Sequence, residues 1–137
     1  MNHWIFVETF HNWQVEERNN FEFMGIKENK FRNKNISFGD KIFIYVSKIK
    51  KFSDVREVIS GKLYDTPSEY NYDREFIKCV KTKSIKILDK EDWLEFSKII
   101  KELEVFTRST SPSNKLLNAP IKLEYNDQQI LKNYFKI

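Results

Sequence analysis

Few side chains in this sequence could make or break bonds, and their spacing argues against catalysis. The two histidines, His3 and His11, stand at opposite ends of one predicted strand. At ~3.3 Å per residue they are roughly 26 Å apart, so we expect that they do not share a metal ion. The one cysteine, Cys79, cannot complete a zinc site. We therefore expect no metal, no cofactor and no catalytic residue, and predict that the chain is not an enzyme.

Other arrangements of reactive residues are also missing from the sequence. Its three glycines are too scattered to form a phosphate-binding loop. The acidic pairs Glu16-Glu17 and Glu91-Asp92 fall on predicted helices, and we interpret them as solvated helix surface. Cys79 lies in a strand-like stretch, where a cysteine usually acts as a small core hydrophobe. A lone cysteine forms no internal disulfide, which favours a reducing, cytoplasmic compartment.

Positive charge is concentrated in one part of the chain. Residues 27–56 hold nine basic and three acidic residues, a net charge of +6, whereas the whole chain carries +4. Such clustering favours a polyanionic partner through counterion release, although a solvated lysine-rich face fits the charge equally well. We expect nucleic acid as the partner, and the candidate phosphate contacts are Lys27, Lys30, Arg32, Lys34, Lys48, Lys50 and Lys51.

These residues need a folded framework, which the composition supports. The chain has 137 residues, 40% of them hydrophobic and 15% aromatic, with only three glycines and three prolines. This describes a compact globular chain, and we expect a single domain over residues 1–137. The longest apolar run, residues 42–46, is too short to span a membrane, so we expect no membrane partner and no signal peptide.

Residues 38–47 are the predicted centre of the fold. Gly39-Asp40 provides turn chemistry, and the following run from Ile42 to Val46 is rich in β-branched and aromatic residues. An apolar run without alternation is typical of a strand buried on both faces. The strand delivers Tyr45 and Ser47 to its end, where a basic loop begins.

The remaining elements are predicted from hydrophobic periodicity and turn residues. The first are a strand over residues 3–10, a short helix capped by Asn12, an extended piece over 21–26 and a charged connection with a turn of helix over 27–36. After the central strand come either a strand pair or one long bent strand over 52–64, with a bulge or bend at Gly61, and a strand over 76–88 with a bulge near Lys81. A helix after residues 89–92 that runs to Leu103 and a closing helix capped at Asn126 complete the chain. Strands mixed with a few helices, without βαβ alternation, indicate an α+β fold around a curved, barrel-like sheet.

Five short motifs follow one another in a recognisable order and spacing. They are Trp4-Ile5, Asn12-Trp13 followed by Val15, Gly25-Ile26, Gly39-Asp40 before Ile44-Tyr45-Val46, and Leu63-Tyr64-Asp65. Together they resemble EVE-domain proteins, in particular the small single-domain microbial branch of that family. The resemblance implies a PUA-like fold, a curved pseudo-barrel sheet with flanking helices related to the YTH and ASCH groups. It also implies a reader of modified bases in DNA or RNA that holds the base in an aromatic-walled pocket.

Candidate pocket residues follow from the resemblance, position by position. Three segments match the walls of the family's pocket: the end of the first strand with Asn12-Trp13, the stretch from Phe23 to Gly25, and the exit of the central strand. The implied pocket residues are Thr9, Asn12, Trp13, Phe23, Met24, Gly25, Tyr45, Ser47 and Arg108. The sequence departs from the family pattern at Phe38, where proline is usual, at Val46, where many members have histidine, and at Phe23 and Met24, where tryptophan is expected.

Roles can be assigned to these residues on the same basis. Trp13, Phe23 and Tyr45 are expected to stack on the base, although each also fits a core position. Thr9, Asn12, Ser47 and Arg108 are expected to read base edges. Trp4 and Trp93 are predicted to lie in the core. The predicted function is a non-enzymatic reader of a modified base, and the alternative is a protein-interaction or small-ligand-binding domain without a nucleic-acid partner.

Overall fold

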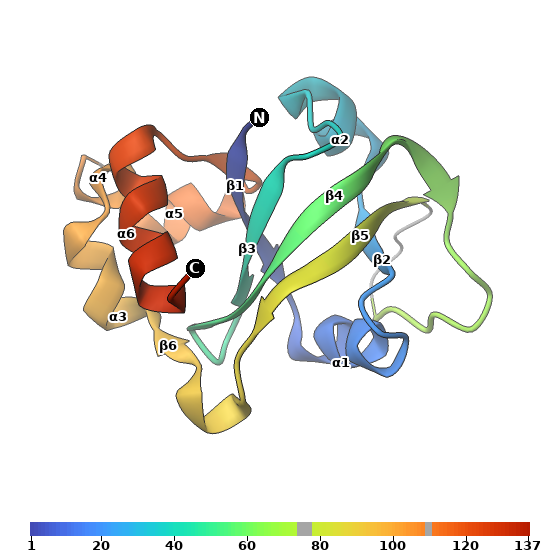
Figure 1. Cartoon of the computed structure of the whole chain (residues 1–137), viewed down its shortest axis with the longest axis horizontal. Coiled ribbons are helices and arrows are strands. Elements are labelled where there is room, and N and C mark those ends of the chain that lie inside the picture. Colours follow the sequence, from blue (N-terminus) through green and yellow to red (C-terminus); the bar gives the residue numbers. More distant parts are fainter. Residues whose placement is uncertain (74–77, 109–110) are drawn as a thin grey trace.

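A mixed β-sheet forms the centre of the molecule in the computed structural model, which describes residues 1–73, 78–108 and 111–137 (Figure 1). Seven strands of the described residues take part, in the order β2-β5-β4-β3-β1-β7, with β6 paired to β4. They are β1 (His3–Glu8), β2 (Phe23–Ile26), β3 (Lys41–Val46), β4 (Lys51–Asp65), β5 (Lys78–Ile87), β6 (Leu94–Glu95) and β7 (Ile121–Lys122). The predicted strand over residues 76–88 is described from Lys78 onward, and its first two residues lie outside the described part.

The predicted central strand is confirmed. β3 lies inside the sheet, parallel to β1 and antiparallel to β4. Ile42, Ile44 and Val46 face one hydrophobic core, while Phe43 and Tyr45 face another on the opposite side. A strand buried on both faces reads as a continuous apolar run, which is why its sequence shows no alternation. Gly39 supplies the turn before it, with φ of 89°.

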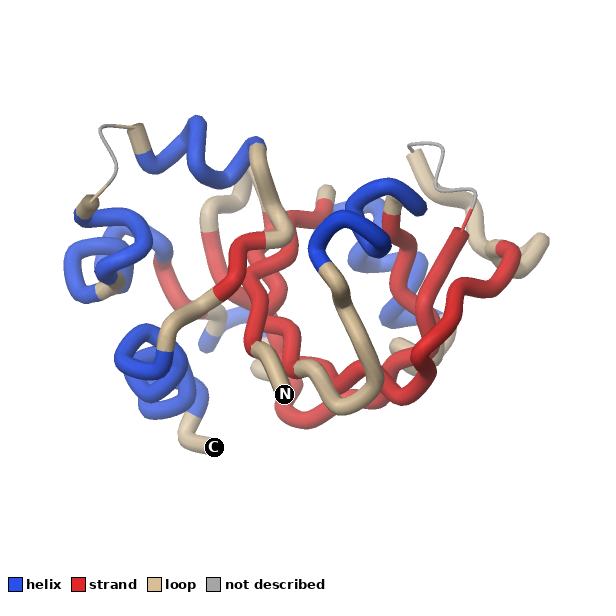
Figure 2. The backbone as a smooth tube through the Cα atoms, turned by 90° about the horizontal axis from the view of Figure 1, so that it is seen from above, coloured by secondary structure: helices blue, strands red, loops and turns tan. Residues whose placement is uncertain are grey.

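Helices cover both faces of the sheet. α1 (Phe10–Arg18) and α2 (Glu28–Lys34) contribute to the first core. α3 (Phe96–Ile99), α4 (Glu104–Thr107) and α6 (Tyr125–Phe135) contribute to the second, and α5 (Pro112–Leu117) packs against its edge. The strands curl between these layers into an open half-barrel, seen from above in Figure 2. Trp4 and Trp93 lie in the first core, as predicted.

The two long strands bend together. Pairing between β4 and β5 shifts between Val58 and Leu63, where β4 passes Gly61. On the partner strand the pairing moves from Thr82 to Val80 and skips Lys81. The bend predicted at Gly61 is confirmed, because four residues of β4 oppose one of β5 there. The bulge predicted near Lys81 was misplaced, since Lys81 pairs in register with Phe23 of β2. The extra residue of β5 is Ile85, between the partners of Val55 and Arg56.

Two predicted helix starts were wrong. Thr9, not Asn12, is the N-cap of α1, because its Oγ1 accepts a hydrogen bond from the Asn12 backbone N–H at 3.2 Å. Consequently β1 ends at Glu8 and the helix begins at Phe10. The last helix begins at Tyr125, so Asn126 lies inside it.

The helix predicted after residues 89–92 was also wrong. That stretch is divided into the 3-10 turns η1 (Lys90–Asp92) and η2 (Ile100–Glu102), β6, α3 and α4. Tertiary hydrogen bonds explain the breaks, because β6 pairs with Lys51 and Phe52 and the Phe96 N–H donates to the Lys50 carbonyl at 3.0 Å. The carboxylate of Asp127 accepts the first two backbone N–H groups of α4, at 2.8 and 3.0 Å, and so starts a new helix there. Among the described residues, no helix is long and apolar enough to cross a membrane.

Candidate functional site

A cavity of about 250 Å³ opens where β1 runs into α1, beside the junction of β2 and α2. α5 and the residues after it form the opposite wall. Pockets for drug-sized ligands usually measure about 300–1,000 Å³, so this volume suits one small ring system. The lining residues are Phe6, Val7, Glu8, Thr9, Asn12, Gly25, Ile26, Lys27, Lys30, Ser47, Leu116, Leu117, Ala119 and Pro120. We call this cavity the β1–α5 pocket.

The parallel pairing of β1 with β3 brings polar side chains from distant parts of the chain into this pocket. Glu8 pairs with Val46 at the ends of the two strands. Just beyond, Ser47 donates both its backbone N–H and its Oγ to the carbonyl of Glu8, at 2.8 and 3.2 Å. Thr9 follows Glu8 and caps α1, which turns Asn12 toward the same space. Capping and strand pairing therefore fix three of the predicted base-reading residues.

The β2–α2 junction supplies the second polar wall. Gly25 donates its backbone N–H to Oε2 of Glu16 at 3.1 Å, which anchors β2 to α1. After β2, the chain turns into α2 and places Lys27 and Lys30 in the lining, Lys27 exposed and Lys30 half-buried. The pocket thus joins uncharged polar groups with two cations.

A loop after β4, residues 66–73, is hydrogen-bonded to the start of α1. The backbone N–H of Asp73 donates to Oδ1 of Asn12 at 2.9 Å, and Oγ1 of Thr9 donates to Oδ1 of Asp73 at 3.2 Å. His11 Nε2 donates to the carbonyl of Asn71 at 2.6 Å. The 66–73 loop therefore already uses hydrogen-bonding groups on two residues that line the pocket.

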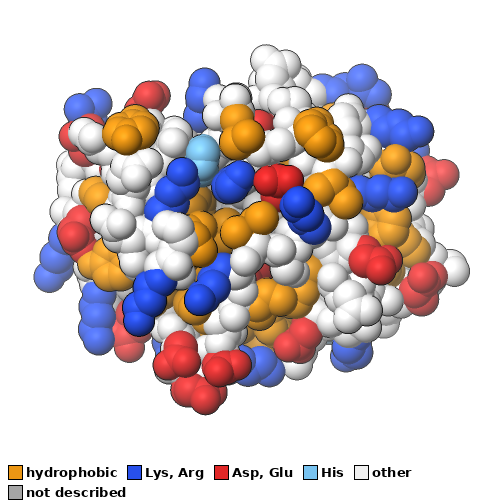
Figure 3. Space-filling model, in the orientation of Figure 1, with side chains coloured by type: hydrophobic (Ala, Val, Ile, Leu, Met, Phe, Trp, Pro, Cys, Tyr) orange, Lys and Arg blue, Asp and Glu red, His pale blue; other side chains and the backbone are white. Residues whose placement is uncertain are grey.

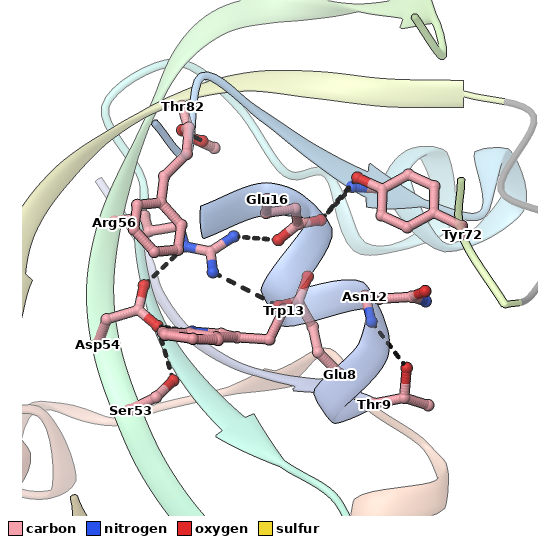
Figure 4. A network of polar contacts seen from close by, with 12 residues as sticks. Glu8, Thr9, Asn12, Trp13, Glu16, Ser53, Asp54, Arg56, Tyr72 and Thr82 are labelled. Carbon is pink, nitrogen blue, oxygen red and sulfur yellow. Dashed lines mark hydrogen bonds and ion pairs between the residues drawn. The ribbon is translucent and has the colours of Figure 1, made fainter. Parts of the chain in front are cut away.

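A buried ionic cluster lies beneath α1 (Figure 4). Arg56 donates Nε to Asp54 at 2.7 Å and Nη2 to Glu8 at 3.4 Å, and its Nη1 donates to Glu16. All four side chains are between 0% and 4% exposed, so the prediction that Glu16 lies on a solvated helix surface was wrong. Tyr72 extends the cluster, because its hydroxyl donates to Oε2 of Glu16 at 2.7 Å. We call these four charged residues the Arg56 cluster.

Three carboxylates around one guanidinium shift the ionisation of the cluster. Burial, together with the neighbouring Glu16 carboxylate, raises the pKa of Glu8 well above its ordinary value. Burial would lower the pKa of Arg56, but the carboxylates of Asp54, Glu8 and Glu16 outweigh it and raise that pKa. Burial and Glu16 likewise raise the pKa of Tyr72.

The structure places the predicted apolar and aromatic pocket residues differently from the polar ones. Trp13 is 1% exposed and Met24 is 0% exposed, both in the first core. Tyr45 is 5% exposed on the other side of the sheet, where it packs edge-on against Phe96 at 5.0 Å. Phe6 is the one aromatic side chain in the described pocket lining. In this conformation, Trp13, Met24 and Tyr45 offer no face to a ligand in the β1–α5 pocket.

Two further predicted pocket residues lie outside the lining. Phe23 is half-buried on the outer part of the sheet, with ring contacts to Tyr64 at 6.0 Å and Tyr70 at 6.1 Å. Arg108 follows α4, is exposed, and pairs with Glu104 at 3.1 Å. Of the nine predicted residues, Thr9, Asn12, Gly25 and Ser47 are brought together around the pocket.

The predicted phosphate contacts fall into two groups. Lys27, Lys30, Arg32 and Lys34 lie on or beside α2, and the first two line the pocket. Lys48, Lys50 and Lys51 lie in and after the β3–β4 turn, outside the lining of the pocket. The basic stretch of the sequence is therefore divided between the two ends of β3.

The wall from α5 was missed by sequence reasoning. Leu116 is half-buried and Leu117 is 79% exposed, although both are apolar. The exposure of Leu117 is the structural signal, since large exposed apolar groups often mark binding surfaces, and the sequence alone does not show it. Among the described residues, no group of three His, Cys, Asp or Glu side chains could hold a metal ion.

Sequence comparison identifies the family. The EVE domain model matches residues 2–125 of this chain. The chain belongs to the EVE domain family. No curated protein is similar enough in sequence to match it.

Solved structures of the same fold are similar to this EVE domain. The Pho92 YTH domain in complex with m6A has a TM-score of 0.69 at 14% identity, over 99% of this chain and 84% of that one. A hypothetical protein from Leishmania major has a TM-score of 0.66 at 16% identity, over 99% and 95% of the two chains. The YTH domain of Zygosaccharomyces rouxii MRB1 in complex with N6-methyladenosine RNA has a TM-score of 0.66 at 11% identity, over 97% and 86%. The α+β, PUA-like fold is thereby confirmed.

Proposed function

We propose that this EVE domain binds one modified nucleobase of an RNA or DNA strand in the β1–α5 pocket. One observation carries the proposal. Thr9, Asn12, Gly25 and Ser47, which were expected from the family resemblance to form a base pocket, line one cavity together with Lys27 and Lys30. Cations beside a small polar and apolar pocket suit a base attached to a phosphate backbone.

The polar groups of the pocket can read a base edge. Asn12 is 1% exposed, and its Nδ2 amide has no hydrogen-bond partner among the described residues, so it can donate to a ring nitrogen or carbonyl. Ser47 Oγ donates to the Glu8 carbonyl and keeps its lone pairs to accept from a base N–H. A donor and an acceptor on adjoining strand ends match the donor and acceptor pattern of a nucleobase edge.

The apolar part of the pocket suits an added methyl group. Aliphatic surface comes from Ile26, Leu116, Leu117 and Pro120. Phe6 supplies the one aromatic ring in the described lining. Burying one methylene or methyl group contributes about 0.8 kcal/mol, so a methylated base should bind better than the unmodified base. Because an aromatic stack is worth ~1–3 kcal/mol per base, a mostly aliphatic wall predicts weaker binding than a pocket with two aromatic walls.

Two structural neighbours support RNA as the first polymer to test, since both are YTH domains solved with an N6-methyladenosine ligand or RNA.

We also propose that the domain acts by binding alone, without catalysis. Its buried carboxylates are engaged with Arg56 rather than directed at a substrate.

Calorimetric titration with short single-stranded oligonucleotides tests this function. RNA and DNA strands are compared at one fixed moderate salt concentration, with and without methylated adenine, methylated cytosine or hydroxymethylated cytosine. Tryptophan fluorescence is a poor reporter here because Trp4, Trp13 and Trp93 are all at most 7% exposed. Selective binding of one modified strand supports the proposal, and equal weak binding of every strand contradicts it.

A surface variant locates the binding in the pocket. Leu117→Ala removes apolar wall surface from a side chain that is 79% exposed, so the stability of the fold should change by less than about 0.5 kcal/mol. Affinity for the preferred strand should fall roughly fivefold. Ile87→Ala is the matched control, because Ile87 is 45% exposed and does not line the pocket.

The second candidate function is a small-ligand-binding domain, which the aliphatic wall of Leu116, Leu117, Ala119 and Pro120 favours. Salt dependence separates the two functions. Phosphate contacts make affinity fall steeply with salt, whereas a neutral ligand binds almost independently of it.

A further inference from the structure

A second cavity, of about 310 Å³, lies between α2 and the bend of β4. Its lining combines three cationic side chains with one acidic side chain and an apolar floor. None of its residues belongs to the lining of the β1–α5 pocket. The lining residues are Glu28, Phe31, Arg32, Gly61, Lys62, Leu63 and Lys78. We call it the α2–β4 hollow.

The cations of the hollow are held weakly. Arg32 pairs with Glu28 at 3.2 Å, and these side chains are 70% and 48% exposed. Lys78 pairs with Asp65 at 2.7 Å, and Asp65 is 87% exposed. Exposed pairs of this kind are worth about 0.2–1 kcal/mol, so an incoming anion can replace either carboxylate at small cost.

Lys62 is the most available of the three cations. It is exposed, and its Nζ lies 5.1 Å from the centre of the Tyr64 ring. Among the described residues it has no acidic partner. Buried Phe31 and half-buried Leu63 form the apolar floor of the hollow. The aliphatic parts of lysine and arginine side chains can lie along this floor while their charged ends face solvent.

One helix separates this hollow from the β1–α5 pocket. Lys27 and Lys30 face the pocket, whereas Glu28, Phe31 and Arg32 face the hollow. An α-helix with its side chains is about 10–12 Å across, so the two sites are a short distance apart along a nucleic-acid strand. Lys and Arg side chains also gather on the surface over α2 and the bend of β4 (Figure 3).

We propose that the α2–β4 hollow binds a phosphodiester group of the same strand whose base enters the β1–α5 pocket. The strand then crosses α2, with Lys62, Lys78 and Arg32 around the phosphate. This inference rests on the proposed function. Arg32 was expected from the sequence to contact phosphate, whereas Lys62 and Lys78 are assigned by the structure alone.

Salt titrations of Lys62→Gln and Lys78→Gln test the site. Each lost phosphate contact on a single strand should make the negative slope of log affinity against log salt shallower by about 0.7. At about 0.1 M salt this corresponds to roughly a fivefold loss of affinity. A free nucleoside with the same modified base cannot reach the hollow, so its affinity should be unchanged in both variants. Lys101→Gln, an equal charge change on exposed η2, is the control and should leave the slope unaltered.

The outcomes separate this inference from the function on which it rests. If the nucleoside and the strand bind but Lys62→Gln and Lys78→Gln behave like Lys101→Gln, the hollow is not a phosphate site and the pocket assignment stands. A poly-glutamate peptide that binds as tightly as the strand, with the same loss in both variants, would also overturn the inference. If no strand and no nucleoside binds, both proposals fail.

Discussion

Trp13 donates its indole Nε1–H to Oδ1 of Asp54 across 2.8 Å, which ties α1 to β4. The same carboxylate accepts from Ser53 and Arg56. The indole also packs edge-on against Trp93, with ring centres 4.9 Å apart. Trp13 therefore holds α1 against the sheet, and the pocket depends on it indirectly, because α1 supplies Asn12.

Replacing Trp13 should unfold rather than merely inactivate the domain. Trp13→Ala should lower the free energy of unfolding by about 3–5 kcal/mol, because it leaves a large cavity in the first core. Trp13→Phe keeps much of the packing but leaves Asp54 without one donor, and should cost about 1–3 kcal/mol. Urea denaturation followed by circular dichroism measures both. A Trp13→Ala protein of wild-type stability that no longer binds its base would instead make Trp13 a ligand contact.

The Arg56 cluster should be intolerant of losing its cation. Arg56→Met leaves the carboxylates of Asp54, Glu8 and Glu16 buried without their partner. Removing one partner from a buried ion pair typically costs about 3–5 kcal/mol, and that is the expected loss of unfolding free energy. Lys98→Met, which removes an exposed pair with Glu95, is the control and should cost no more than about 0.5 kcal/mol. Equal denaturation midpoints for the two variants would contradict this.

His3 should make the stability of the domain depend on pH. It is 6% exposed, and neither ring nitrogen has a hydrogen-bond partner among the described residues. Burial, with nearby Lys132 and Lys41, lowers the pKa of His3 from 6.5 to about 4. Between these two values the unfolded chain binds the proton more tightly, so stability is complete above pH 6.5 and falls as the pH drops toward 4. The loss attributable to His3 is on the order of 3 kcal/mol.

A variant isolates this effect from the carboxylates that also titrate at acid pH. His3→Phe removes the titrating ring and keeps an aromatic ring beside Phe43, which His3 stacks against at 6.4 Å. Denaturation at pH 7 and pH 4.5 should show a smaller drop for His3→Phe than for the wild-type chain. An identical drop in both proteins would show that His3 does not contribute.

Local patterns predicted the parts of the fold that depend on local chemistry. The apolar run of β3 and the bend at Gly61 were readable because strand burial and glycine geometry are expressed within a few residues. The convergence of Thr9, Asn12, Gly25 and Ser47 was predicted only through the family resemblance, since the pairing of β1 with β3 that joins them is long-range.

The failures trace to hydrogen bonds between residues far apart in the sequence. Residues 94–103 have helical spacing, but pairing of β6 with β4 and the Asp127 carboxylate at the start of α4 divide them. Trp13 fitted either a stacking or a core role, and its bond to Asp54, 41 residues away, places it in the core. Short-range periodicity carries no information on such partners. The aliphatic wall of α5 was missed because periodicity does not show that Leu117 stays exposed, or that α5 lies beside the end of β1.

The 66–73 loop should compete with the ligand for the pocket. Asp73 accepts from Oγ1 of Thr9 at 3.2 Å, so a base that needs this hydroxyl must displace the carboxylate. Asp73→Ala frees Thr9 Oγ1 and should raise the affinity for the modified nucleoside about fivefold, since one hydrogen bond is worth roughly 1 kcal/mol. Calorimetry measures this change in affinity with the free nucleoside. Because the nucleoside has no phosphate, removing the negative charge of Asp73 does not also change an electrostatic repulsion between the domain and the nucleic-acid backbone. Asp73→Asn keeps an acceptor for Thr9 and should stay near the wild-type affinity. A fall in affinity for Asp73→Ala would mean that Asp73 belongs to the binding site, because the loop would then help to hold the base rather than exclude it.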